Sequence, residues 1–558
     1  MVGLKVTSTI SMGVDACPGP VFWATLATMS DESEATGRLV RDSGKLSALT
    51  MTSRVLGLIR DRTRGAMLGT GILADAFTVA FSVPNLFRRL FAEGSMSVAF
   101  IPTVKAYFTE GDKDHTEEFL SATYTVLTVI VWAVVALGVA ASPLLVRLFK
   151  SDPVETTVLL RIMFPFLALV SIAAFFQGIL NALGSFGPSG FAPILFNLSF
   201  ILVPMVVGRY MVNPARAMAV GVLVGGSLQA LCQLPYVIRL GARFRLVRLS
   251  KAFGNPGMRR VLSLIAPTIL GMAAYEVNGL VSTSLASQAG TGVVTALSFS
   301  LRLQELVLGV FVVSVGTVLL PELSGLAARS EWQQYKMRLI RALEVIALIT
   351  VPVAVFSICE RVDIVSLLFK TQEFSDASVA MTAGAFFFHM IGLPFIGANR
   401  ILAPAFYARS DTRTPAWAGI IAVCVNITAA ILLKPSMGGS GIALALSIAS
   451  AVNTVVLFTM LVRMGIDGLG AALGSVILYV LRLLVFSALA ATPLILLRGW
   501  FASLFTSFDT PLMVYGAPFA ISAVLFAVIG VGLLILSKDT SALFLVSSLR
   551  RRSKKRTN

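Results

Sequence analysis

Long apolar runs separated by short polar segments occupy most of the chain, and this pattern predicts an all-α polytopic membrane protein. A helix needs about 20 mainly apolar residues to cross a bilayer. Windows of that length predict fourteen transmembrane helices, of which the first carries the most charge. The predicted spans are 47–66, 73–104, 122–147, 159–183, 188–208, 217–238, 261–285, 293–320, 340–358, 380–405, 415–433, 440–462, 473–497 and 513–537.

The basic residues between the spans predict how the chain is oriented. The loops at 239–260, 329–341 and 409–413 are rich in lysine and arginine, whereas those at 286–292 and 434–440 carry almost no charge. Cytoplasmic loops carry an excess of basic residues. Both termini are therefore predicted to be cytoplasmic.

Short internal matches with nearly the same spacing predict two related lobes. An even number of spans in each copy makes the repeat parallel, and transporters of this design bind substrate between their lobes. The matches, 219 to 221 residues apart, are VRLFK at 146–150 with SLLFK at 366–370, LGTG at 68–71 with AGTG at 289–292, and Pro102 with Pro321.

These features predict two pseudo-symmetric six-helix lobes followed by two C-terminal helices. The first 45 residues are polar or mixed, which favours a disordered cytoplasmic extension over a signal peptide; a gene model that starts too early would look the same. The predicted parts are the extension 1–45, the N-terminal lobe 46–240, a basic cytoplasmic linker 241–260, the C-terminal lobe 261–463, two further helices within 464–540, and a basic cytoplasmic tail 541–558.

Composition agrees with a membrane protein and argues against several functions. Hydrophobic residues make up 56% of the chain and charged residues only 13%, with a mean hydropathy of +0.86; a soluble chain carries about 25% charged residues. The net charge of +17 is concentrated beside the spans, so no nucleic-acid partner is predicted. No cofactor is predicted, and a metal site is left undetermined, because the cysteines show no paired spacing and only two histidines are present: Cys17, Cys232, Cys359, Cys424, His115 and His389.

Six arginines lie within or beside the first two predicted spans, and another lies within the eighth. An arginine facing lipid at mid-bilayer costs about 2.5–3.5 kcal/mol on insertion scales, so these side chains must meet water, a carboxylate or an anionic ligand. Local pairs are predicted between Arg89 and Glu93 and between Arg302 and Glu305. Arg62, Arg64 and Arg89 are interpreted as helix-end residues, and a ligand-binding role is favoured for Arg54, Arg60, Arg88 and Arg302.

Guanidinium groups predict the kind of ligand. Arginine holds a phosphate or pyrophosphate through two parallel hydrogen bonds and never loses its charge. A phosphorylated lipid is the natural anion inside a membrane, so the sequence predicts a cavity that receives such a lipid. In the second span, Pro84 is predicted to break the helix ahead of Asn85 and Arg88.

Four stretches resemble the MurJ/MviN family of lipid II flippases, which belongs to the MOP exporter superfamily with MATE drug exporters and Wzx flippases. The resemblance covers about residues 46–540 and is most specific in the first two spans. The stretches are SRVLGLIRD at 53–61, ADAFTVAFSVPNLFRRLFAEGSMSVAFIP at 74–102, GILNALGSFGPSGFAPILFN at 178–197 and APAFYARSDTRTP at 403–415.

The resemblance implies a transporter that acts in peptidoglycan and cell wall biogenesis and in cell shape. It implies export of undecaprenyl-pyrophosphate-linked peptidoglycan precursor, lipid II, from the inner to the outer leaflet of the bacterial cytoplasmic (inner) membrane. The last two helices would form a groove for the lipid tail. Besides lipid II, membrane lipids and the cell-wall synthesis machinery are the implied partners.

The resemblance also implies which residues act, and the chain departs from the family pattern at three places. The essential cavity arginines of the family fall on the four residues favoured above. Leu301, Ser82 and Leu306-Val307 stand where the family often has an acid, a lysine and Phe-Pro, so local ion pairing is expected to differ. The supporting charged residues fall on Asp61, Asp75, Glu93, Glu305 and Arg400.

Other functions stay open as alternatives. A Wzx-like flippase for another prenyl-pyrophosphate-linked saccharide shares the anion chemistry, and a MATE-like antiporter shares the fold but would favour acids for cationic cargo. An enzyme is not predicted, because no loop is long enough to form a catalytic domain. For energy coupling, Glu276 and Asn426 are candidates for a cation site, although local pairing of Glu276 is favoured, and the membrane potential is a further candidate.

Overall fold

The computed structural model describes residues 48–90, 99–505, 507–508, 510 and 512–539, and all regular structure in these residues is helical. A first helix covers 48–68. The predicted extension 1–45, the tail 541–558 and Glu93 lie outside the described residues. The remaining elements are α2 (Ile72–Arg88), α3 (Ile101–Glu110), α4 (Lys113–Val146), α5 (Pro153–Met163), α6 (Phe166–Ala182), α7 (Phe186–Val207), η3 (Gly208–Tyr210), α8 (Pro214–Arg239), α9 (Leu249–Gly254), α10 (Pro256–Ser287), α11 (Val293–Ala328), α12 (Trp332–Cys359), α13 (Arg361–Phe369), α14 (Asp376–Tyr407), α15 (Arg413–Met437), α16 (Gly439–Val462), α17 (Leu469–Ser503), η4 (Leu512–Gly516) and α18 (Ala517–Leu536).

Ten membrane-span candidates emerge from the described helices by length and apolar composition, and each coincides with a predicted span. They are α4, α5 with α6, α7 with η3, α8, α12, α14, α15, α16, α17, and η4 with α18. The other four predicted spans fall on helix 48–68, on α2 with α3, on α10 and on α11. The first helix and the end of α2 contain the arginines that lower their hydropathy.

Some helix boundaries differ from the predictions. Pro84 does not break the second span, because α2 continues through it to Arg88. Buried neighbours on both sides of Pro84 hold the turn, and membrane helices tolerate proline when packing replaces the lost hydrogen bond. The predicted span 159–183 divides at Phe164-Pro165 into α5 and α6, and the linker 241–260 contains α9 and the first turn of α10.

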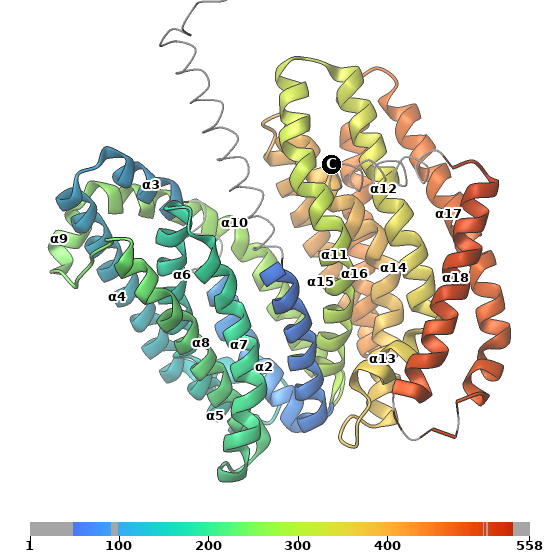
Figure 1. Cartoon of the computed structure of the whole chain (residues 1–558), viewed down its shortest axis with the longest axis horizontal. Helices are drawn as coiled ribbons and strands as arrows, with labels where there is room; N and C mark the ends of the chain where they lie inside the picture. Colours follow the sequence, from blue (N-terminus) through green and yellow to red (C-terminus); the bar gives the residue numbers. More distant parts are fainter. Residues whose placement is uncertain (1–47, 91–98, 506, 509, 511, 540–558) are drawn as a thin grey trace, which may run out of the picture.

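The helices gather into two groups that approach each other at one end (Figure 1). Helices α2 to α9 lie on the left and α11 to α18 on the right, with helix 48–68 and α10 between them. The groups come close near α2 and α13 and diverge toward the end where α3 and α9 lie. At the close end, one apolar core joins Phe77 and Val79 of α2 to Val294 and Leu297 of α11.

The last two helices pack against α12 on the outer side of the second group. Apolar clusters join α17 and α18 to Val355 and Phe356 of α12. A polar cluster completes the junction at the end of α12, where Glu360 is only 3% exposed and is hydrogen-bonded to Asp363 and Ser522. Arg498 of α17 pairs with Asp363 at 2.9 Å, so this cluster ties α13 to both C-terminal helices.

Candidate functional site

A cavity of about 510 Å³ lies where the two helix groups diverge, and arginine dominates its charged lining. Helix 48–68 contributes Arg54 and Arg60, the end of α2 contributes Arg88 and Arg89, and α11 contributes Arg302. No aspartate or glutamate belongs to the lining formed by described residues. The structure thus brings together the four arginines chosen from the sequence, and it adds Arg89.

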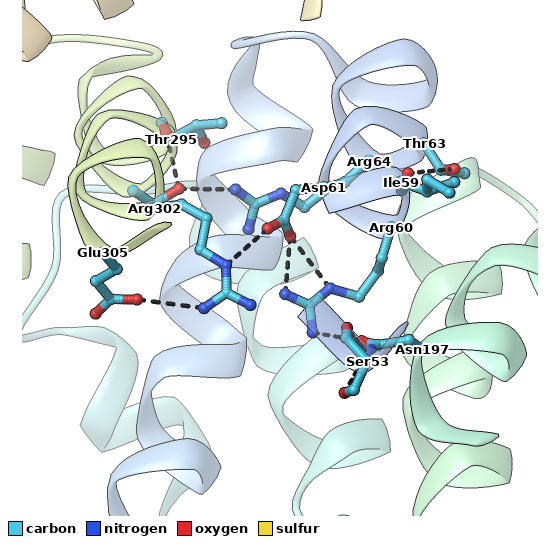
Figure 2. Close-up of polar contacts among 11 residues, drawn as sticks. Ser53, Ile59, Arg60, Asp61, Thr63, Arg64, Asn197, Thr295, Arg302 and Glu305 are labelled. Carbon is cyan, nitrogen blue, oxygen red and sulfur yellow. Dashed lines mark hydrogen bonds and ion pairs between the residues drawn. The ribbon is translucent and has the colours of Figure 1, made fainter. Parts of the chain in front are cut away.

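Asp61 links guanidinium groups that come from the two sides of the cavity (Figure 2). Its Oδ1 accepts from Arg60 at 2.9 Å and its Oδ2 accepts from Nε of Arg302 at 3.0 Å. The carboxylate is 5% exposed, so both bonds lie in a poorly hydrated place where charge interactions are strong. One carboxylate therefore fixes the position of two arginines that are 242 residues apart in the chain.

Further contacts hold these two arginines in place. Nη1 of Arg302 donates to Glu305 at 3.2 Å, as the sequence predicts for residues one helical turn apart. Nη1 of Arg60 donates to the side-chain oxygen of Asn197 at 3.1 Å, and Asn197 in turn donates to the carbonyl of Ser53. Neighbouring side chains thus fix the orientation of both arginines.

Two glycines leave room for guanidinium groups. A Cβ atom at Gly309 would lie 2.5 Å from Nη1 of Arg54, and one at Gly57 would lie 3.2 Å from Nη2 of Arg302. Side chains at these positions would push the arginines away. On α2, Arg88 donates from Nε to Asn85 at 2.9 Å, one turn earlier in the same helix.

Arg62 and Arg64 lie in the last two turns of helix 48–68, and Arg89 is the C-cap residue of α2, so all three lie near helix ends. Arg62 donates to the carbonyls of Leu367 and Leu368 at 2.8 Å each, which caps the end of α13. Arg64 donates to Ser298 and lies over the ring of Phe299. These two arginines join helix 48–68 to the second helix group, because carbonyls and hydroxyls there replace water as partners.

A second cavity of about 300 Å³ adjoins the first, since Asn85 and Arg89 line both. Glu276 lies in its wall and pairs at 3.3 Å with Arg89, which is 187 residues away in the chain, so this partner is not the local one that the sequence favours. Asn426 lines the same cavity and donates to Asn278 and Ser282. The two candidate cation ligands therefore share one cavity.

The end opposite the arginine cavity is sealed by contacts between the two helix groups. Asp75 of α2 accepts from the backbone of Gly292 at 2.6 Å and from the backbone and hydroxyl of Thr295 at 2.9 and 2.7 Å. A carboxylate is stabilised at a helix start by free N–H groups and the helix dipole. We call these contacts, together with the 2.8 Å bond between the hydroxyls of Thr70 and Ser378, the seal.

The other implied residues lie at different places. Glu305 lines the second cavity. Arg400 is exposed on α14 and lines neither cavity. The sequence analysis missed a set of neutral amides on α6 and α8 in the arginine cavity, although their spacing of four residues within apolar spans was a visible signal. These amides are Gln177, Asn181, Gln229 and Gln233.

The helical fold and the cationic cavity between two helix groups together define a polytopic membrane transporter. Residues 65–516 match the family model described as lipid II flippase MurJ. The chain belongs to the MurJ lipid II flippase family. Membership in a family of flippases confirms the prediction of a transporter rather than an enzyme.

Relatives along nearly the full length support this assignment. The chain is 40% identical over 522 residues to the probable lipid II flippase MurJ of Treponema pallidum, covering 92% of this chain and 98% of the relative. It is 32% identical to the lipid II flippase MurJ of Burkholderia cenocepacia over 434 residues, which are 75% of this chain and 83% of the relative.

Solved structures show the same fold. A lipid II flippase MurJ in an inward closed conformation matches with a TM-score of 0.73 at 23% identity, covering 88% of this chain and 99% of that one. An inward-facing MATE multidrug transporter of the MOP superfamily matches with a TM-score of 0.64 at 15% identity, over 76% and 98% of the two chains.

Proposed function

We propose that this protein flips lipid II from the inner to the outer leaflet of the bacterial cytoplasmic membrane, with the pyrophosphate bound by Arg54, Arg60, Arg88 and Arg302. The observation that carries the proposal is the convergence of these four residues, from three helices, on one cavity whose described lining holds no carboxylate. The identity of the cargo, lipid II, is inferred from relatives that are named as lipid II flippases.

The chemistry of the charged lining supports an anionic ligand. Five arginines line the cavity, and Asp61, Glu305 and Glu276 pair with three of them. A pyrophosphate that links a lipid to a sugar carries two ionised oxygens, and guanidinium groups bind such oxygens through paired hydrogen bonds.

The mechanism that we propose is alternating access between two six-helix lobes, 46–240 and 261–463, in a fourteen-span arrangement with cytoplasmic termini. The cavity is then open toward the cytoplasm, and the seal closes the outward end. In the empty cavity, mutual repulsion of the arginines opposes closure of the cavity. A bound dianion removes this repulsion. Loading therefore favours the change of access, while the lipid tail stays in the bilayer along α17 and α18.

Complementation of a conditional flippase mutant tests the proposal, with lipid II accessibility measured separately in each leaflet. We expect the wild-type chain to restore outer-leaflet lipid II and growth, and Arg88→Ala to restore neither at equal protein abundance. Restored growth without outward movement of lipid II would contradict the proposal. Faster transport of another prenyl-pyrophosphate-linked saccharide than of lipid II would favour the Wzx-like alternative. Efflux of drugs would favour the MATE-like alternative.

A further inference from the structure

The arginine cavity has a second chemical face that anion binding does not use. Besides Asn85 and Asn197, which contact arginines, four neutral amide side chains line it, two from α6 and two from α8, and these helices pack against each other. Residues four apart lie on the same face of a helix. We call Gln177, Asn181, Gln229 and Gln233 the amide set.

The placement of Gln177 and Gln233 shows that the amide set faces the cavity. Gln177 is exposed although Phe175, Phe176 and Gly178 around it are buried, because it points into the cavity. Gln233 is 1% exposed, and its Nε2 donates to the carbonyl of Gln229 at 2.9 Å. Its Oε1 is buried and has no partner among the described residues, which is unfavourable for a polar atom.

Aromatic rings line the same cavity as the amide set. Phe81, Phe166 and Phe196 line the same cavity, and the ring of Phe166 lies 6.2 Å from that of Phe81 and 5.5 Å from that of Phe196. Binding sites for neutral ligands combine apolar rings with a few polar groups that fix orientation. The volume of the cavity falls within the range of about 300–1,000 Å³ that is typical of such sites.

Amides suit a ligand group that both donates and accepts hydrogen bonds and carries no charge. Each glutamine or asparagine offers one acceptor oxygen and two N–H donors. Sugar hydroxyl and acetamido groups have the same dual character, whereas phosphate oxygens only accept and prefer guanidinium. The lining thus separates into an anion-binding part and a part matched to a saccharide.

We propose that the amide set and the three phenylalanines form a saccharide subsite, which receives the hydroxyl and acetamido groups of the sugars joined to the pyrophosphate. This inference rests on the proposed function, because it concerns the same cargo in the same cavity. Side chains on α6 and α8 would then distinguish a lipid pyrophosphate that carries sugars from one that does not.

Binding measurements on the full-length protein in nanodiscs test the subsite with two probes, undecaprenyl pyrophosphate and lipid II. Gln177→Leu and Gln229→Leu should each weaken lipid II binding about five-fold, the value of one net hydrogen bond, and should leave the Kd for undecaprenyl pyrophosphate unchanged. Gln334→Leu, at an exposed position of α12 outside both cavities, is the matched control and should change neither Kd.

A second variant separates binding from folding. Gln233→Leu removes a buried unpartnered acceptor, so we expect an unchanged or higher Tm together with weaker lipid II binding. Equal weakening of both probes, or of neither, by Gln177→Leu and Gln229→Leu would overturn the subsite while leaving the flippase proposal intact. Failure of the wild-type protein to bind either probe would instead overturn the proposed function.

Discussion

At the scale of single residues, Arg302 shows why guanidinium chemistry matters. Asp61 and Glu305 hold it from two sides, and Gly57 leaves space beside its Nη2 atom. A lysine would keep the charge but would lose the planar fork that pairs with both carboxylates. The surrounding residues therefore fix the position of the Arg302 guanidinium group in addition to pairing with its charge.

We therefore expect Arg302→Ala to abolish flipping and Arg302→Lys to leave a small residual activity. Loss of hydrogen bonds to a charged group costs about 1.5–3 kcal/mol, which corresponds to at least a ten-fold loss of pyrophosphate affinity. The measurement is leaflet accessibility of fluorescent lipid II in proteoliposomes. Arg463→Ala, at an exposed arginine outside both cavities, is the control, and full activity of Arg302→Lys would refute the role of the fork.

Sequence reasoning reached the cavity arginines because an arginine inside an apolar span is costly and therefore visible. It did not identify the partners of Arg62 and Arg64, because the sequence cannot show which distant carbonyl or hydroxyl lies opposite. The partners of Arg62 are more than 300 residues away. Neutral amides were overlooked for a related reason, since they add little to the charge pattern.

At the scale of elements, the seal joins α2 to the start of α11. Gly292 has a φ of +84°, and a Cβ atom there would lie 2.2 Å from the carbonyl oxygen of Thr70. The position therefore requires glycine both for backbone conformation and for close approach. Its N–H also donates to Asp75, so the glycine and the carboxylate act together.

Gly292→Ala should weaken the seal by about 1–3 kcal/mol, because backbone strain and a steric clash add together. The matched control is Gly111→Ala, since Gly111 has a φ of +76° with no atom within 4 Å of an added Cβ. Thermal unfolding and the accessibility of an outward-facing cysteine measure the effect. Equal behaviour of the two variants would show that the contact with Thr70 contributes nothing.

The junction of α13 with the C-terminal helices predicts a pH dependence. Burial raises the pKa of Glu360 to about 7, and the charge and hydrogen bond of Asp363 add to the shift. Because the folded-state pKa lies above the ordinary value of 4.5, the stabilisation is complete below pH 4.5 and is lost as pH rises through 7. The loss amounts to at most about 3 kcal/mol.

We expect the Tm of the wild-type protein to fall between pH 5 and pH 8 and the Tm of Glu360→Gln to change less over the same range. Glutamine mimics the protonated acid and keeps a hydrogen bond to Asp363. Calorimetry in detergent at several pH values measures both slopes. Parallel slopes for the two proteins would mean that another group causes the pH dependence.

At the scale of the whole molecule, the proposed alternating access requires the seal to open while the arginine cavity closes. Thr70 and Ser378 lie in different helix groups, and their hydroxyls are 2.8 Å apart. A covalent link between these positions would hold the outward end shut. The present arrangement of the groups would then become permanent.

A Thr70→Cys, Ser378→Cys pair should form a disulfide that blocks flipping, and reduction should restore it. Replacement of the native cysteines keeps the test specific. An Asn399→Cys, Thr454→Cys pair links α14 to α16 within one helix group, where the native side chains are 2.9 Å apart, and should leave transport unaffected. Undiminished flipping by the crosslinked Thr70–Ser378 variant would refute alternating access at the seal.

The architecture was predictable in outline, and its details depended on tertiary packing. Ten of the fourteen spans predicted from apolar windows coincide with span candidates among the described helices, because bilayer thickness sets the length of a span. The continuation of α2 through Pro84 and the division at Phe164-Pro165 were not predictable, since neighbouring helices decide whether a turn with a missing hydrogen bond persists.

The ion pairs of Arg302 with Asp61 and Glu305 also limit how an anion can bind to this arginine. Nε and Nη1 of that guanidinium already donate to these carboxylates. An anion that binds either edge of the guanidinium through two hydrogen bonds must therefore displace one of them. Chloride is a single atom and has no pair of oxygens with which to form a two-point hold, so it competes poorly for such an exchange. Arg302 therefore favours an anion with paired oxygens over a monatomic one.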